Sequence, residues 1–139
     1  MSGPLSGRRA LITGSSHGVG KSAAFLFAEQ GAEVILHGNQ NMADADAAVQ
    51  QIGPRALGAV QADLMMPGAG RDLYDAALHL AGGRIDIVVN NAGIHWDTPL
   101  DSSDETWEAN WAGILQVNLM AVADICRAAI PEMKESGGG

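Results

Sequence analysis

The sequence predicts an α/β protein in which a doubly wound parallel sheet lies between two layers of helices. Two observations support this class. Short runs of β-type composition alternate with segments of helical periodicity, and a glycine-rich stretch directly follows the first of those runs. Because helices separate the successive strands, the strands cannot pair as hairpins. The sheet is therefore expected to be parallel, with right-handed crossovers and helices on both faces.

The alternation comprises four strands and three helices, and the expected strand order across the sheet is 3-2-1-4. The last of the four runs reads Ile-Asp-Ile-Val-Val, which is apolar at four of its five positions. Such a run is typical of a strand that is covered on both faces. The strands are expected at residues 10–13, 34–37, 56–61 and 85–89, and the helices at residues 19–30, 42–52 and 71–81.

A longer helix is expected in the last third of the chain. The segment Ser102-Ser103-Asp104-Glu105 resembles a capping box, in which Ser102 and Glu105 satisfy free amides, so the helix should begin near Ser103. Pro131 can only end or kink it, and residues 136–139 should form a loop. Several apolar residues and one asparagine fall on one stripe of this helix: Trp111, Leu115, Asn118, Val122, Ile125 and Ala129.

The composition argues against several classes of partner. The chain has 8 Lys plus Arg against 16 Asp plus Glu, a net charge of −8, so neither nucleic acid nor an anionic membrane surface is an expected partner. No apolar run approaches the roughly 20 residues of a membrane span. Residues 1–9 lack the apolar stretch of a secretory signal, so a cytoplasmic location is expected. No metal is expected, because the histidines lack ligand spacing and Cys126, predicted to lie in the core, has no second cysteine.

A glycine-rich motif, Thr-Gly-Ser-Ser-His-Gly-Val-Gly at residues 13–20, follows the first strand and opens the first helix. Glycines let the backbone approach a pyrophosphate, and the free amides of a helix start favour its negative charge. We expect phosphate groups to dock on the amides of residues 15–19. The alternative is a strand-to-helix turn that binds nothing. The candidate cofactor-binding residues of this motif are Gly14, Ser15, Ser16, His17, Gly18, Val19 and Gly20.

A second motif, Asn-Asn-Ala-Gly, follows the fourth strand. The carboxyl ends of parallel strands meet at one edge of a sheet, which is where ligands of open α/β sheets bind. Asparagine and glycine also tolerate left-handed backbone angles, so the motif on its own is equally consistent with a turn. Its candidate binding residues are Asn90, Asn91, Ala92 and Gly93.

Together, the two motifs resemble those of the classical short-chain dehydrogenase/reductase family, over nearly the whole chain. The resemblance implies one Rossmann-type dinucleotide-binding domain over residues 1–139. Asp63, followed by Leu64, resembles the family's adenine-contacting aspartate. Asn118 resembles its catalytic-tetrad asparagine, whose side chain and local helix distortion support a water in the proton relay. Each has a simpler alternative: Asp63 starts a turn, and Asn118 braces the neighbouring backbone.

The end of the second strand bears on the choice of cofactor. An NAD enzyme usually has an acidic residue there, and this chain has Gly38, followed by Asn39. The missing carboxylate removes repulsion toward a 2′-phosphate, and His17 takes the place where NADP-dependent members often have a basic residue. NADP is therefore expected in preference to NAD. The resemblance implies a small carbonyl or alcohol substrate, which the sequence does not identify.

The rest of the family's catalytic machinery has no counterpart in this sequence. The family requires a serine after strand five and a Tyr-x-x-x-Lys on the next helix, whereas the one tyrosine, Tyr74, is followed four positions later by Leu78. Tyr74 is expected to be partly buried. These 139 residues look like the amino-terminal half of a reductase that is truncated after the fourth strand and its helix. They are therefore expected to be inactive alone.

A different class of function stays open beside this one. The chain could be a non-enzymatic nucleotide-binding half-domain that acts through a partner. Coding sequence for Tyr-x-x-x-Lys directly downstream of Gly139 would separate the two hypotheses. In either case the fourth strand has no fifth strand at its outer edge, and an exposed apolar edge recruits another strand. The long helix resembles the one that packs against a partner subunit in this family, so it should present an apolar face. We therefore expect a homo-oligomer (dimer or tetramer), a complex with the missing carboxyl-terminal half, or an aggregate.

Overall fold

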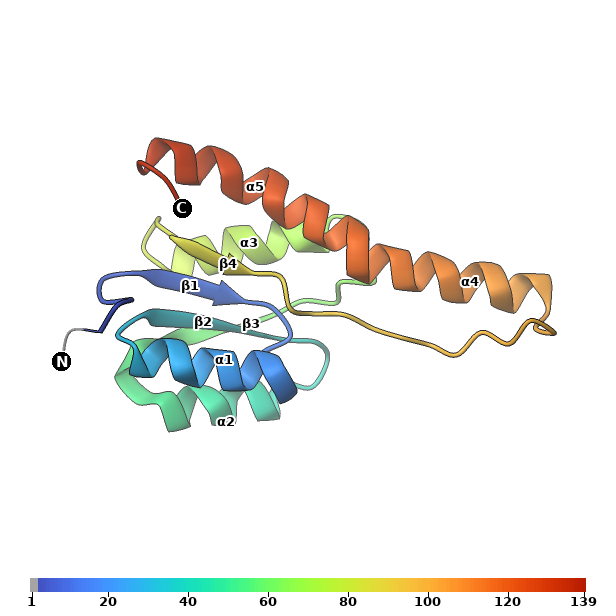
Figure 1. Ribbon diagram of the computed structural model, residues 1–139, viewed down its shortest axis with the longest axis horizontal. Coiled ribbons are helices and arrows are strands. Elements are labelled where there is room, and N and C mark those ends of the chain that lie inside the picture. The colour runs from blue at the N-terminus through green and yellow to red at the C-terminus, as the bar shows by residue number, and fades with distance from the viewer. Residues whose placement is uncertain (1–2) are drawn as a thin grey trace.

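The computed structural model describes residues 3–139. Its sheet is parallel throughout, and the strand order β3-β2-β1-β4 confirms the predicted order (Figure 1). The alternating pattern of strand and helix segments is confirmed with it. The strands are β1 (Arg9–Ile12), β2 (Glu33–Gly38), β3 (Ala56–Gln61) and β4 (Ile87–Val89).

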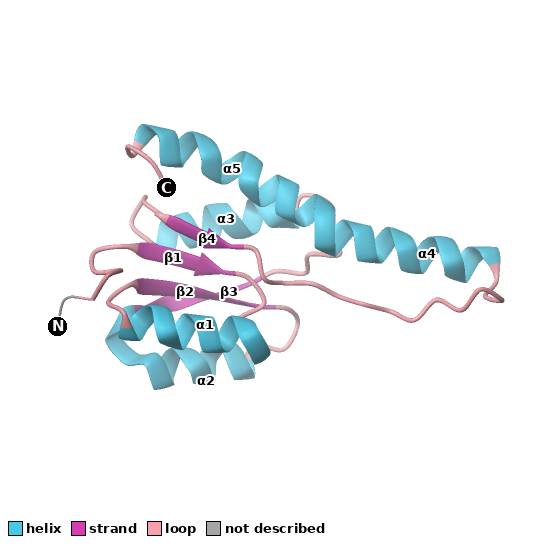
Figure 2. Ribbon diagram, viewed as in Figure 1, coloured by secondary structure: helices cyan, strands magenta, loops and turns pink. Residues whose placement is uncertain are grey.

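Helices cover both faces of the sheet, which gives the predicted three layers (Figure 2). Helices α1 (Gly18–Glu29) and α2 (Ala43–Ile52) lie on one face, with a short 3-10 helix (Gly53–Arg55) before β3. Helices α3 (Ala69–Leu80) and α5 (Ala121–Glu135) lie on the other. Side chains alternate between the layers as strand geometry requires: Ala10 and Ile12 pack toward α1, and Leu11 packs toward α3 and α5.

Strand β4 is shorter than predicted. It begins at Ile87 rather than Ile85, and its three residues are half-buried. The apolar run does pack on both faces of the sheet, since Val88 joins one hydrophobic cluster and Ile87 and Val89 join the other. In the described part of the chain, however, β4 pairs only with β1. The partial exposure of the β4 residues therefore comes from this open edge and not from an uncovered face of the sheet.

The last third forms one continuous helical rod (Figure 1). It consists of α4 (Asp104–Leu115), a π-helical segment (Gln116–Met120) and α5, and it continues through Pro131 to Glu135. The predicted cap is wrong by one residue. The Ser103 hydroxyl, not that of Ser102, accepts the amide of Thr106 at 3.2 Å and also bonds its hydroxyl at 3.0 Å.

The predicted apolar stripe is correct only in its second half. Ile125 and Ala129 are buried, but Trp111 and Leu115 are 44% and 48% exposed. A π-helix takes more residues per turn than an α-helix, so the segment in the middle of the rod rotates one half of the stripe away from the other. The residues that face the domain instead recur every fourth position: Gly113, Val117, Ala121, Ile125 and Ala129.

The rod also bears on the expectation that no segment could span a membrane. The helix Asp104–Glu135 has 32 residues, and its most apolar window has a mean hydropathy of 1.4 and is 28% buried. By length and composition alone it is apolar enough to cross a membrane. The core helices of folded domains meet the same criterion, and the α5 part of this helix packs against α3.

A buried carboxylate ties the start of the sheet together. Asp86, just before β4, accepts hydrogen bonds from the Arg9 amide at 2.9 Å, from Arg84 Nε at 2.9 Å and from Arg8 Nη1 at 3.3 Å. Burial acts to raise the pKa of this carboxyl, but the Arg9 amide and the two guanidinium groups outweigh it. The pKa of Asp86 therefore lies below its usual value, and the carboxylate is favoured in the fold.

Asp86→Asn is expected to lower the free energy of unfolding by about 1–3 kcal/mol near neutral pH, because charged hydrogen bonds become neutral ones. A carboxyl with a depressed pKa stabilises the fold above its unfolded pKa, near 4, and loses that contribution as pH falls through its folded value. The difference in the free energy of unfolding between parent and variant should therefore disappear below about pH 4. Urea unfolding at several pH values measures it, with the exposed Asp101→Asn as control. A gap that stays constant with pH would contradict this account.

Candidate functional site

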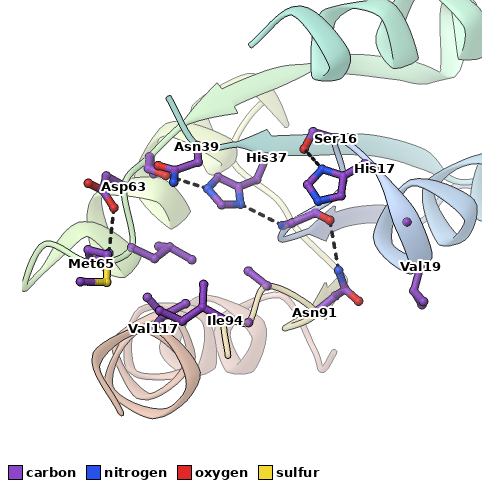
Figure 3. Close-up of a pocket in the computed structure, with 16 residues that line it drawn as sticks. Ser16, His17, Val19, His37, Asn39, Asp63, Met65, Asn91, Ile94 and Val117 are labelled. Atoms are coloured by element: carbon purple, nitrogen blue, oxygen red, sulfur yellow. Dashed lines mark hydrogen bonds between the residues drawn. The ribbon is translucent and has the colours of Figure 1, made fainter. Parts of the chain in front are cut away.

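A cavity of about 430 Å³ lies at the carboxyl ends of the strands (Figure 3). Five segments line it: the turn after β1 (residue 14 and residues 16–19), the end of β2 (His37 and Asn39), residues 62–65, residues 91–94, and Val117 of the π-helical segment. The two predicted motifs therefore meet in one place. Five predicted site residues do not line the cavity: Ser15, Gly20, Gly38, Asn90 and Asn118.

A hydrogen-bonded clamp joins the two motifs. The Thr13 hydroxyl accepts the amides of Asn91 at 3.0 Å and Ala92 at 2.9 Å. In return, Asn91 Nδ2 donates to the carbonyl oxygens of Thr13 at 3.0 Å and Gly14 at 3.1 Å. Thr13 is buried and its partners are half-buried, so these bonds fix the turn after β1 against the segment after β4.

The glycines of the first motif serve different purposes. Gly14 has a φ of +61°, and a side chain there would meet the backbone of Ala92. A side chain at Gly20 would collide with Asn91 and with the carbonyl of Gly14, so Gly20 permits close packing behind the turn. Gly18 also has a positive φ, of +60°, but a side chain there would meet open space. Among these three, only Gly18 leaves room on the cavity side.

Ser15 corrects one part of the prediction. Its amide donates to the His37 carbonyl at 3.1 Å, and its hydroxyl donates to Ile12 and accepts the His37 amide. Ser15 is completely buried, so it holds the turn and has no amide left for a ligand. The amides of residues 16–19 differ, since within residues 3–139 they have no hydrogen-bond acceptor. The α1 N-cap, His17, is extended and supplies no side-chain bond, which leaves that helix start available to an anion.

His37 is a site residue that the sequence-based prediction missed. Its Nδ1 accepts the Gly14 amide at 2.9 Å, and its Nε2 lies 2.9 Å from the carbonyl oxygen of Ala62 (Figure 3). A carbonyl can only accept, so the proton is on Nε2 and the ring is neutral. Burial lowers the pKa of His37, and the bond to Ala62 opposes this only in part. The available signal was a polar residue inside an otherwise buried strand, which must find partners.

Asp63 starts the predicted turn and also lies at the cavity. Its Oδ1 accepts the amide of Met65 at 3.0 Å, which makes it the first residue of a turn, and it also lines the cavity (Figure 3). Leu64 beside it is buried, and its carbonyl accepts Gln116 Nε2 at 3.3 Å. The turn thus holds this wall of the cavity against the π-helical segment.

Asn118 has the bracing arrangement. Its Oδ1 accepts the Ile94 amide and its Nδ2 donates to the Ile94 carbonyl, both at 2.8 Å. The helix distortion implied by the family resemblance is present, because Asn118 lies in the middle of the π-helical segment. Its side chain does not line the cavity, whereas its neighbour Val117 does.

Two further predicted residues point away from the cavity. Asn90 donates from Nδ2 to Cys126 Sγ at 3.7 Å, toward α5. Gly38 is buried, and a Cβ there would lie 2.7 Å from Met42 Sδ and 3.3 Å from Ala45 Cβ. Of the residues around Gly38, Asn39 is the one that lines the cavity.

Tyr74 is fully buried, not partly buried as predicted. It lies in α3 within the core on the far side of the sheet from α1, and within the described residues its hydroxyl has no hydrogen-bond partner. Burial raises its pKa, and the charges of Glu132 and Asp75 add to the effect. Tyr74 cannot take the part of an acid or base in the cavity.

The chain resembles known proteins over almost all of its length. A family model described as short chain dehydrogenase matches residues 8–139. A short-chain type dehydrogenase/reductase of Picea abies is 36% identical over 147 residues, which cover 97% of this chain and 52% of that protein. The chain thus spans about half the length of the curated relatives it matches.

Two solved structures show the same fold with different nucleotides. A 3-oxoacyl-(acyl-carrier-protein) reductase from Agrobacterium tumefaciens with NADP bound has a TM-score of 0.82 and 34% identity, over 95% of this chain and 50% of that one. A 3-ketoacyl-(acyl-carrier-protein) reductase from Brucella melitensis complexed with NADH has a TM-score of 0.80 and 36% identity, over 96% and 53%.

The Thr13 hydroxyl offers a direct test of the clamp. Thr13→Val keeps the shape of the side chain but leaves two partly buried amides without an acceptor, so the free energy of unfolding should fall by about 1–3 kcal/mol. Thr13→Ser keeps the hydroxyl and loses one methyl group, worth about 1 kcal/mol or less. Urea unfolding of both variants measures the difference. Equal losses would show that the methyl group, not the hydrogen bonds, stabilises this edge.

Proposed function

Because the chain belongs to the short-chain dehydrogenase family, we propose that it forms the cofactor-binding half of an NAD(P)-dependent oxidoreductase. The reaction is hydride transfer between a nicotinamide and a small carbonyl or alcohol substrate. The observation that carries the proposal is the clamp between Thr13 and Asn91, which brings both motifs to one cavity. No single motif could do so, since each alone is also an ordinary turn.

The residues at the start of α1 fit a pyrophosphate. The amides of residues 16–19 are free, Gly18 adds no side chain in the open space before them, and a helix start carries partial positive charge. We assign the phosphates to these amides, without that of Ser15. Asn39, Asp63 and Leu64 form the part of the cavity beyond His37 and would hold the adenosine end. When bound, the nicotinamide supplies or accepts the hydride.

NADP is the proposed cofactor in preference to NAD. Solved relatives hold either nucleotide, so membership of the family does not decide the choice. The proposal rests on His17 and Asn39, which line the cavity without negative charge, and Gly38 before Asn39 carries no carboxylate either. A 2′-phosphate would meet no repulsion from these three positions.

The acid/base part of the reaction is not carried by the described residues of the cavity. Reduction of a carbonyl needs a proton donor beside the hydride donor, and Tyr74 is buried elsewhere. We therefore propose that these 139 residues bind nucleotide but do not turn it over alone. The alternative function, a nucleotide-binding half-domain that acts through a partner, makes the same prediction for binding and differs only in what the partner supplies.

Cofactor preference gives the decisive measurement. Asn39→Asp should shift the ratio of the two dissociation constants toward NAD by about tenfold, because Asn39 lines the cavity and a carboxylate there would repel the 2′-phosphate. The parent asparagine is the matched reference, because asparagine and aspartate have nearly the same shape and differ in charge. Isothermal calorimetry with NADP and NAD measures all four constants.

Two outcomes of this titration would count against the proposal. If the parent chain already binds NAD more tightly than NADP, the interpretation of Gly38, His17 and Asn39 is wrong. If it binds neither nucleotide, the proposed function itself fails.

The projecting helix supports a proposal about assembly. Five large apolar side chains are 38% to 57% exposed along α4 and the π-helical segment: Trp107, Trp111, Leu115, Leu119 and Met120. A surface of this kind marks an interaction site. We propose a second copy of the chain or the carboxyl-terminal half of the enzyme as its partner.

Light scattering of the chain tests the assembly proposal. The 139-residue chain should not run as a 14.4 kDa monomer, and Leu115→Lys with Leu119→Lys should shift it toward that mass. A monodisperse 14.4 kDa parent with cooperative melting would contradict the proposal and favour the half-domain.

A further inference from the structure

The His37 ring bridges two walls of the nucleotide cavity. It extends from the end of β2 and lies between the Gly14 turn and the segment that begins at Ala62 (Figure 3). Gly14 begins the phosphate turn, and Ala62 directly precedes Asp63. The distance between these two walls therefore depends on one imidazole ring with a 2.9 Å bond on each side.

The backbone of His37 holds the turn as well. Its amide donates to the Ser15 hydroxyl at 2.9 Å and its carbonyl accepts the Ser15 amide at 3.1 Å. These two bonds survive any change of the side chain. A substitution at His37 therefore tests what the ring does, without releasing β2 from the turn.

Only one protonation state of the ring fits both neighbours. The Gly14 amide can only donate, so Nδ1 must present a lone pair, and the Ala62 carbonyl can only accept, so Nε2 must carry the proton. A second proton would go to Nδ1, directly opposite the Gly14 amide, and would replace a hydrogen bond with two opposed donors.

The charged groups around the ring are few. The turn after β1 contributes His17 and the segment after β3 contributes Asp63, whose Oδ1 is bound to the Met65 amide. Residues 91–94 and Val117, which complete the cavity, contain no titratable side chain. Among the described residues, the hydrogen-bond partners of the ring are the Gly14 amide and the Ala62 carbonyl, and neither is a carboxylate. The repulsion between a protonated Nδ1 and the Gly14 amide is therefore not offset by a negative charge bonded to the ring.

We propose that His37 is a positioning residue whose neutral ring sets the spacing of the nucleotide cavity, so that protonation of the ring releases the Gly14 turn and weakens cofactor binding. This inference rests on the proposed function. Burial lowers the pKa of His37 below 6.5, so the competent neutral form predominates at neutral pH. The affinity for nucleotide should be constant well above the pKa of His37. It should weaken as pH falls through the pKa that His37 has in the nucleotide-free chain, with a limiting slope of about tenfold per pH unit.

The sign of this pH dependence separates positioning from simple attraction. A histidine that only attracted phosphates would gain charge in acid, and the nucleotide would then bind more tightly as pH falls. Positioning by the neutral ring predicts the opposite slope. His17 must be removed from the comparison, because it lines the same cavity and could produce the attractive effect.

The experiment is a calorimetric titration with NAD between about pH 4.5 and about pH 8, a range that extends well below the ordinary pKa of a histidine and in which the pyrophosphate keeps its charge. The chain with His17→Asn is the reference, and His37→Asn is added to it. The reference should lose affinity toward acid, whereas the added His37→Asn should bind about fivefold more weakly at neutral pH and with no slope. His79→Asn, an exposed position on α3, is the matched control and should leave the slope in place.

Nitrogen NMR of the ring supplies a readout that a merely structural role would not give. At neutral pH, His37 should show a protonated Nε2 and an unprotonated Nδ1, and the amide signal of Gly14 should move as the ring titrates. Circular dichroism melts confirm that each variant is folded.

Each result has one interpretation. An affinity that rises toward acid, a slope that persists in His37→Asn, or a flat profile in the reference would overturn the positioning role while leaving the proposed function intact. If the reference binds neither NAD nor NADP at any pH, the proposed function fails and the inference fails with it.

Discussion

The site depends on one side-chain hydroxyl at the end of β1. Thr13 is the point at which the chain leaves the sheet, and its hydroxyl binds the two amides that follow β4. These bonds place the glycine turn beside the Asn-Asn-Ala-Gly segment, although nearly 80 residues separate them in sequence. The position of the glycine turn beside the cavity and its close packing at Gly20 go with this contact. Without it, the sheet could form while its carboxyl edge stayed open.

The architecture could be predicted because it depends on local pattern. Alternating apolar runs and helical periods determine which segments pair, and parallel pairing follows from the helices between them. What failed was decided by the geometry of the backbone, which residue spacing does not show. Trp111 and Leu115 have the right spacing for a buried stripe, but the π-helical segment turns them away from the domain. The choice of Ser103 over Ser102 as cap depends similarly on where the loop enters α4.

The candidate site could be predicted as two motifs but not as a network. The motifs named half of the sixteen residues that line the cavity, since glycine and asparagine indicate tight turns from sequence alone. Ser15 and Asn90 lie inside the two motifs and yet bind elsewhere, because a motif does not state which way a side chain faces. His37 was missed for the opposite reason. It lies outside both motifs, and its role appears only when three separate segments are folded together.

The polar groups at this edge divide into two sets, and the division explains how the cavity can exist before a ligand arrives. The first set forms hydrogen bonds to the protein's own backbone, and it comprises the side chains of Thr13, Ser15, His37 and Asn118. The amides of residues 16–19 do not form such bonds. The first set holds the walls rigid, so the second set can stay unpaired toward the cavity without the turn collapsing onto itself. A nucleotide that binds such a site meets donors already in place, and little of its binding energy is lost in ordering them.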